Sequence, residues 1–156
     1  MKMTTGDNAK AAVAEALNGI LADSFALYLK TKNFHWHVSG PHFRDYHLMF
    51  DEHAAQIFAT IDVIAERVRK NGHRTLTSIG DITRRQSIAD NDAAKVGAAD
   101  MLDELRSDNL MLVAKLRETK ELAAEAGDNA TDGLMDDWTD QAEERAWFLL
   151  AIAQKD

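Results

Sequence analysis

The chain of 156 residues contains no cysteine and only one proline. The absence of cysteine excludes disulfides and thiolate chemistry, and it is compatible with a reducing cytoplasm. No apolar run approaches the roughly 20 residues that a membrane span needs, and residues 1–10 lack the apolar core of a signal peptide. We therefore expect a soluble cytoplasmic protein without a membrane segment.

Basic residues are also scarce relative to acidic ones. The sequence has 18 Lys and Arg against 26 Asp and Glu, which gives a formal net charge of -8. A chain with a net negative charge is poorly suited to bind nucleic acid over a broad surface, and it mildly favours the attraction of cations.

Apolar residues recur at intervals of three and four through most of the chain, which predicts long amphipathic helices. A single domain over residues 1–156 is expected, with a short N-terminal segment over 1–6. The connection over 72–91 is too long for a simple loop and fits a crossover that carries a short helix over 79–85. The predicted fold class is an all-α four-helix bundle with that short helix between its second and third helices. The long helices are expected over residues 7–37, 41–70, 92–126 and about 131–153. On the fourth helix the predicted core residues are Leu134, Trp138, Ala142, Phe148, Leu149 and Ile152.

The second predicted helix carries two pairs of metal-binding side chains on one face. His47 and Asp51 are four residues apart, as are Asp62 and Glu66, so the members of each pair lie one above the other. The pairs are separated by about 16 Å along a helix that rises ~1.5 Å per residue, too far for one ion to bridge. They are symmetric about the middle of the helix. A second copy packed antiparallel across a two-fold axis would therefore bring the pairs of two chains together.

A turn at Ser39–Pro41 brings one more ligand to this site. It ends the first helix and starts the second, so that His35 is expected beside His47. Two imidazoles and three carboxylates without a thiolate suit iron, manganese or zinc. The predicted site combines His35, His47 and Asp51 of one chain with Asp62 and Glu66 of its partner.

The residues around this site form a longer motif. It resembles the ferroxidase signature of the Dps family, the mini-ferritins, and the likeness extends over nearly the whole chain. The matching positions are Asn33 to Trp36, Val38, Gly40, Phe43, His47, Phe50 and Asp51, followed by Asp62, Ala65, Glu66 and Arg67.

The resemblance implies a ferritin-like four-helix subunit and a hollow homododecamer built from two-fold dimers. It also implies ferroxidase activity, in which about two iron(II) ions per site are oxidised, preferentially by hydrogen peroxide, and ferric oxide is stored in the cavity. His35, His47, Asp51 and Glu66 would hold the metals, and Asp62 would bridge them or support the ligands. Zinc would compete, because it usually outranks iron(II) in affinity.

Several other residues have two interpretations. Trp36 adjoins a ligand and is either a redox-active aromatic, as the resemblance implies, or a packing residue that excludes water. Asp128, Asp132 and Asp136 either favour the start of the fourth helix through its dipole or, as the resemblance implies, line a pore that admits iron. We expect the remaining histidines to be surface or hydrogen-bonding residues rather than ligands. These are His37, His42, His53 and His73.

Two alternative functions remain open. Dps proteins often compact DNA through a lysine-rich tail and are then nucleoid-associated, but residues 1–6 contain only Lys2. This composition argues against direct DNA binding, so protection of DNA would be chemical, and no DNA-binding residue is predicted. A purely structural helical oligomer would be recognised by its failure to take up iron. A larger ferritin is disfavoured because no Glu-x-x-His motif is present.

Overall fold

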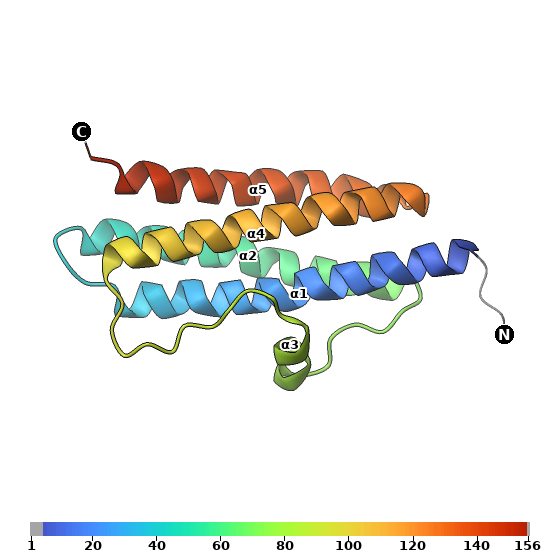
Figure 1. Ribbon diagram of the computed structural model, residues 1–156, viewed down its shortest axis with the longest axis horizontal. Helices are drawn as coiled ribbons and strands as arrows, with labels where there is room; N and C mark the ends of the chain where they lie inside the picture. The colour runs from blue at the N-terminus through green and yellow to red at the C-terminus, as the bar shows by residue number, and fades with distance from the viewer. Residues whose placement is uncertain (1–4, 156) are drawn as a thin grey trace.

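The structure, a computed structural model, describes residues 5–155, which form α-helices and connections without a β-strand (Figure 1). The four long helices make the predicted bundle, and the short helix lies within the crossover. The helices are α1 (Thr5–His37), α2 (Phe43–Lys70), α3 (Ile79–Arg85), α4 (Ala98–Glu125) and α5 (Asn129–Ala153).

The bundle consists of two antiparallel hairpins, α1 with α2 and α4 with α5. The crossover between them runs back along the length of the bundle, so that α4 points in the same direction as α2 (Figure 1). α3 lies on the side of α1, against which it packs. The turn between α1 and α2, where the site is predicted, is therefore at one end of the bundle.

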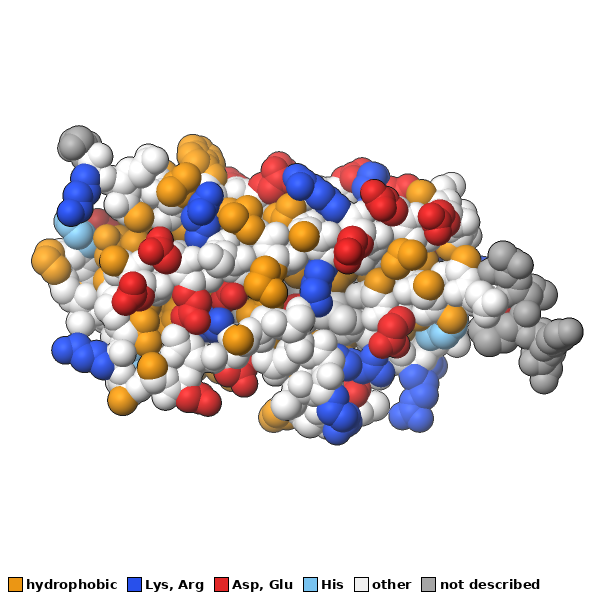
Figure 2. Space-filling view, viewed as in Figure 1, with side chains coloured by type: hydrophobic (Ala, Val, Ile, Leu, Met, Phe, Trp, Pro, Cys, Tyr) orange, Lys and Arg blue, Asp and Glu red, His pale blue; other side chains and the backbone are white. Residues whose placement is uncertain are grey.

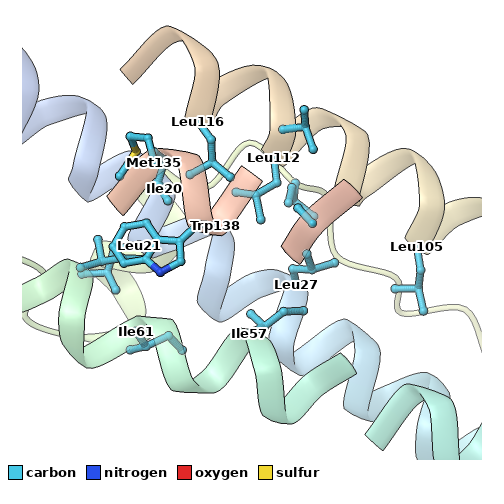
Figure 3. Packing of buried hydrophobic residues seen from close by; sticks show 14 of the residues in the cluster. Ile20, Leu21, Leu27, Ile57, Ile61, Leu105, Leu112, Leu116, Met135 and Trp138 are labelled. Carbon is cyan, nitrogen blue, oxygen red and sulfur yellow. The ribbon is translucent and has the colours of Figure 1, made fainter. Parts of the chain in front are cut away.

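The core runs along the whole bundle and is formed by the apolar stripes of all four long helices. Figure 3 shows Trp138 of α5 reaching into it, where Leu21 of α1, Ile61 of α2 and Leu116 of α4 also point. Each buried Leu or Ile contributes roughly 1.5–3 kcal/mol relative to an exposed one. Phe148 departs from the predicted core, because its side chain is 37% exposed at the surface of α5.

α1 is long and apolar enough to span a membrane by length and composition, with a hydropathy of 1.3 over its best window. The sequence analysis did not anticipate this. Of that window 61% is buried inside the bundle, which is the behaviour of a core helix.

The helix boundaries differ from the predicted ones mainly at the start of α4. α1 begins at Thr5, so residues 5 and 6 are helical, whereas residues 1–4 of the predicted flexible segment lie outside the described part of the chain. α2 begins at Phe43, because Pro41 and the next residue form a turn. α5 begins at Asn129, two residues earlier than expected.

The predicted start of the third long helix at residue 92 was wrong by six residues. Gly97 caps α4 in an extended conformation, with φ -68° and ψ 150°. Before it, the side chain of Asn91 accepts a hydrogen bond from the backbone of Ala93 at 3.0 Å and donates one to Glu104 at 2.8 Å. These side-chain bonds compete with helical ones, and the segment before Gly97 is irregular rather than helical.

The interior also contains charged groups that the sequence analysis did not predict. Lys30 of α1 is 4% exposed and its Nζ lies 2.8 Å from Asp108 of α4. Asp23 is fully buried and accepts hydrogen bonds from the backbone of Ser87 and Ile88 at 2.6 and 2.9 Å. These contacts attach the crossover to α1 and join α1 to α4.

Candidate metal centre

A short turn joins α1 to α2 and sets the position of the two predicted histidine ligands. The backbone of Val38 still donates to Phe34 at 2.9 Å, and Phe43 already donates to Gly40 at 3.1 Å. Gly40 has a φ of +118°, a region that glycine adopts without steric cost. The chain thus reverses within a few residues, and the last turn of α1 faces the first turn of α2.

His35 and His47 meet across this turn, as predicted. Their rings are stacked, with centroids 3.9 Å apart and an interplanar angle of 14°. Phe43 stacks on the other face of His47, with ring centroids 4.9 Å apart. The ring of His35 is largely enclosed, because its side chain is 12% exposed.

Each of the two histidines is hydrogen-bonded to the backbone of the other. Nδ1 of His35 donates to the carbonyl of His47 at 2.6 Å, and Nδ1 of His47 donates to the carbonyl of His35 at 2.7 Å. A carbonyl oxygen only accepts, so Nδ1 must carry the proton in both rings. In the neutral imidazoles the lone pair is then on Nε2, the form in which histidine binds a metal.

Asp51 follows one turn after His47 and lies beside the pair. Its Oδ1 is 3.8 Å from Nε2 of His35, and its side chain is 53% exposed. The same oxygen accepts from Nζ of Lys32 at 2.8 Å. The Lys32 ammonium holds the pKa of Asp51 below its usual range. The carboxylate is thus ionised and bonded to a cation.

Lys32 is a residue of the site that the sequence analysis missed. It precedes His35 by three residues, so both lie on one face of α1. Its ammonium also lies 5.9 Å from the centre of the Trp36 ring. The helical spacing alone would have placed this lysine next to the predicted ligands.

Asp62 and Glu66 are not part of this cluster. Both are exposed on α2, and α2 is one continuous helix, so they lie about 16 Å and more beyond Asp51 at ~1.5 Å per residue. Within residues 5–155, no group of three or more His, Asp or Glu side chains is placed to hold a metal ion. One chain brings together His35, His47 and Asp51 only.

The face of α2 between the two ligand pairs is apolar and exposed. Phe58 is 57% exposed and contacts Tyr28 of α1, with ring centroids 5.2 Å apart. The small residues Ala55 and Ala59 are exposed on either side of it. An exposed apolar stripe with small residues permits the close approach of another helix.

The predicted tryptophans differ in exposure, and two of the remaining histidines form hydrogen bonds to the backbone. Trp36 is 57% exposed beside the histidine pair, whereas Trp138 is buried as expected. His37 and His73 bond through Nδ1 to the carbonyls of Asn33 and Asn71, at 2.8 and 2.9 Å.

His53 is different, because it is 4% exposed and packs near Phe148 with ring centroids 6.0 Å apart. The expectation of a surface or hydrogen-bonding residue was therefore wrong for His53, which is a core residue.

The three candidate pore residues have partners within the chain. Asp128 caps α5 by accepting from the backbone of Thr131 at 3.1 Å, and it pairs with Arg67 of α2 at 3.3 Å. Burial opposes ionisation of Asp128, but the bonds from Thr131 and its other partners leave its pKa below the usual range. Asp132 and Asp136 both contact the ammonium of Lys120, the second of them at 2.9 Å.

Comparisons with known proteins agree with this architecture. A profile of the ferritin-like domain family matches residues 14–156, so the fold is that of a ferritin-like protein. The X-ray structure of Dps from Thermosynechococcus elongatus superposes with a TM-score of 0.94 at 26% identity, covering 98% of this chain and 97% of that one. The DNA protection during starvation protein of Brevibacillus brevis is 32% identical over 142 residues, 91% of this chain and 95% of its own length. The chain belongs to the Dps family.

A third similar structure belongs to a protein whose description names a metal centre. The Dps protein from Vibrio cholerae O1 is described as a member of a broad superfamily of ferritin-like diiron-carboxylate proteins. It superposes with a TM-score of 0.89 at 27% identity, covering 94% of this chain and 92% of that one.

Proposed function

We propose that this protein oxidises iron(II) at sites shared by two copies of the chain and stores the ferric product in a dodecameric shell. The half-site at the α1–α2 turn carries the proposal. The backbone bonds of His35 and His47 use Nδ1 and leave Nε2 for a metal, with Asp51 3.8 Å from Nε2 of His35, but three such ligands leave a metal under-coordinated. The carboxylates that would complete the set lie on the same helix and out of reach.

A two-fold dimer would complete the site. Antiparallel packing of α2 on its copy would bring Asp62 and Glu66 of one chain to the histidine pair of the other. The exposed apolar stripe around Phe58 would then be buried at the axis. Such a dimer has two equivalent sites, and each takes its ligands from both chains.

Hydrogen peroxide is the proposed oxidant. Two adjacent iron(II) ions each give up one electron, the O–O bond breaks, and both oxygens leave as hydroxide or water. No hydroxyl radical is released, so the reaction would protect cytoplasmic DNA chemically. This role accords with the name of the Brevibacillus brevis relative, a DNA protection during starvation protein. Zinc would occupy the same ligands in competition with iron.

Two supporting roles complete the proposal. Trp36, exposed beside the pair, would supply an electron when the oxidant exceeds the iron. Asp132 and Asp136 would attract iron(II) to the start of α5, while Asp128, as the helix cap, would have mainly a structural role.

The decisive experiment uses two inactive variants that complement one another. One carries His47→Ala and Asp51→Ala, and the other carries Asp62→Asn and Glu66→Gln. Each is assayed anaerobically with iron(II) and hydrogen peroxide, with mass photometry to confirm an intact shell. Each variant alone is expected to oxidise iron no faster than buffer.

Shells reassembled from an equal mixture of the two variants are expected to regain about a quarter of the native sites. Half of the dimers would be mixed, and one of the two sites in each would be intact. A mixture that stays inactive would show that the site is not shared. Native protein that behaves like buffer would instead favour a purely structural oligomer.

A further inference from the structure

Four charged side chains other than histidine are buried within residues 5–155, and three of them meet an opposite charge. Asp23 lies 2.9 Å from the ammonium of Lys115, and Lys30 lies 2.8 Å from Asp108. Arg145 of α5 is the exception. It is 3% exposed, and no carboxylate of the described residues lies within ion-pair distance of its guanidinium. Arginine stays protonated in proteins, so the bundle encloses a positive charge whose counter-ion is not a side chain of residues 5–155.

Exposed arginines on the same pair of helices do have acidic partners. Arg117 of α4 lies 3.1 Å from Glu143 of α5. Figure 2 shows acidic and basic side chains interspersed over α4 and α5. A buried charge without a partner costs far more free energy than an exposed one. The missing counter-ion therefore matters only at Arg145.

The acceptors that Arg145 does find are neutral. Its Nε donates to Oδ1 of Asn109 on α4 at 2.8 Å, and its Nη1 lies 3.5 Å from Oε1 of Gln56 on α2. Two amide oxygens serve a group with five N–H donors. Burial lowers the pKa of Arg145 to about 10, which still leaves it charged at neutral pH. The charge also contributes to the lowered pKa of the neighbouring His53.

A small cavity in the core borders this guanidinium. Its lining comes from all four long helices and includes the side chains between α2 and α5, which pack least closely among the neighbouring long helices. The cavity has room for one occupant of about the size of a water molecule. The lining side chains that carry polar atoms are Ser24, Thr60, Trp138, Gln141 and Arg145.

These polar groups supply donors and no negative charge. The indole N–H of Trp138 can only donate, and it has no acceptor within the described residues. Figure 3 shows the nitrogen edge of this indole facing α2. The hydroxyls of Ser24 and Thr60 donate to helix carbonyls of their own helices at 2.8 and 2.7 Å. Such carbonyls also accept a backbone N–H, so each hydroxyl can turn towards a ligand.

We propose that the cavity binds one small monovalent anion of the halide type, chloride in physiological solution, as the counter-ion of Arg145. A metal cation does not suit a site that has a guanidinium and no carboxylate. Phosphate and organic acids are too large for a space of one water molecule. Water fits by size, but it would leave the buried guanidinium charge without a counter-ion.

The ion would reach the cavity from the side of the bundle between α2 and α5. Thr60 of α2 and Gln141 of α5 line the cavity and are partly exposed there. Once bound, the ion would hold α5 against α2 where the two helices pack least closely. The inference is independent of the proposed iron chemistry, because none of the lining residues belongs to the histidine–carboxylate site.

The test compares unfolding of the full-length assembly in sodium chloride and in sodium gluconate, whose anion is too large for the cavity. Total salt and protein concentration are held constant, and mass photometry checks the assembly of every variant. Arg145→Met removes the buried charge and keeps a long side chain. The matched control Arg117→Met removes an exposed charge from the neighbouring helix. Thr60→Val removes one hydroxyl of the cavity. Crystals of the native protein and of Arg145→Met grown in sodium bromide locate the ion by anomalous scattering.

Chloride is expected to stabilise the native protein and Arg117→Met relative to gluconate. The unfolding equilibrium constant per chain should fall with chloride and approach a tenfold fall for each tenfold rise near saturation. Arg145→Met should lose this dependence, and Thr60→Val should need severalfold more chloride for the same effect. One bromide peak is expected in the cavity of the native protein, within hydrogen-bonding distance of Arg145, and none in Arg145→Met.

Equal stability of the native protein in the two salts, or a cavity that holds water in place of bromide, would overturn the proposal. Chloride dependence that persists in Arg145→Met or disappears in Arg117→Met would overturn it as well. If Arg145→Met does not assemble, the native bromide map and the shift in Thr60→Val decide. Iron oxidation measured on the same variants is expected to be unchanged, which separates these outcomes from failure of the metal site.

Discussion

Nδ1 of His35 donates to the carbonyl of His47, and Nδ1 of His47 donates to the carbonyl of His35, so each residue fixes the tautomer of the other. Side chains that orient metal ligands usually come from a third residue. Here the two proposed ligands orient each other through their backbones, and the α1–α2 hairpin itself holds both rings in the tautomer that binds a metal.

Lys32 is expected to compete with divalent cations at this site. Its ammonium lies 2.8 Å from Oδ1 of Asp51 and would compete with a metal for that carboxylate. Replacement Lys32→Met should raise the affinity for Co²⁺, used as a spectroscopic probe, by up to about fivefold, the scale of an exposed ion pair. The control Lys10→Met removes the same charge elsewhere. Equal affinities of Lys32→Met and the native protein would show that the lysine does not oppose metal binding.

Trp36 is expected to report occupancy of the site. It follows His35 directly and is exposed beside Lys32, whereas Trp138 is buried in the middle of the core. Bound Co²⁺ should quench the fluorescence of the native protein and of Trp147→Phe, but should leave Trp36→Phe almost unchanged. Quenching that persists in Trp36→Phe would assign the signal to another tryptophan.

His53 is expected to make the fold sensitive to mild acid. Burial, together with the charge of Arg145, lowers the pKa of His53 from 6.5 to about 4. Between these values the unfolded chain binds a proton that the folded chain does not, so the free energy of unfolding falls as the pH falls. The loss between pH 7 and pH 5 should be about 2 kcal/mol.

Denaturant unfolding of the native protein and of His53→Gln, at equal protein concentration, tests this expectation. The variant should lose about 2 kcal/mol less than the native protein over the same interval. Identical pH profiles would mean that His53 is protonated or exposed in the folded assembly.

The buried pair of Lys30 and Asp108 should be far more sensitive to the loss of one partner than of both. Lys30→Met leaves a buried carboxylate without its counter-charge, which costs about 3–5 kcal/mol. The double variant Lys30→Met, Asp108→Leu should recover most of that loss. Thermal unfolding of the single and double variants measures the difference, and equal destabilisation of the two would contradict it.

The three aspartates near the start of α5 should divide into a cap and a cation-attracting pair. Asp128→Ala removes the cap and should cost about 1–2 kcal/mol of stability with little effect on the rate of iron uptake. Asp132→Asn with Asp136→Asn should slow iron uptake at low ionic strength and leave the melting temperature nearly unchanged. Stopped-flow iron uptake and thermal unfolding of both variants would separate the two roles.

Helix periodicity predicted the bundle well. Apolar residues at three- and four-residue spacing form one face of a helix, and in a chain of this length such faces are buried by packing against one another. The main error of the prediction was the start of α4. Residues 92–97 are compatible with a helix by composition, but the Asn91 side chain bonds the backbone of Ala93 and the side chain of Glu104, and the segment is not helical. Such a bond depends on a partner, Glu104, whose position is known only after the fold has formed.

The contact between His35 and His47 was predictable from the short turn between two helices, but the ion pair of Lys32 with Asp51 beside it was missed. Lys32 was at the correct spacing, yet its role depends on Asp51, which lies on the next helix. The buried charges were missed for the same reason, because each depends on a partner on another helix. Lys30 and Asp108 lie on apolar stripes and are stable there only because they meet across α1 and α4.

The turn around Gly40 makes the metal centre depend on the length of the chain as well as on its side chains. His35 and His47 face each other because five residues separate the two helices, with Gly40 at a φ of +118°. One inserted residue would rotate the start of α2 by about 100° around its axis if the helix kept its place. His47 would then point away from His35, and every proposed ligand further along α2 would move off the face that the proposed dimer uses. A single insertion in this turn would therefore disable the proposed centre with all five proposed ligands still present in the sequence.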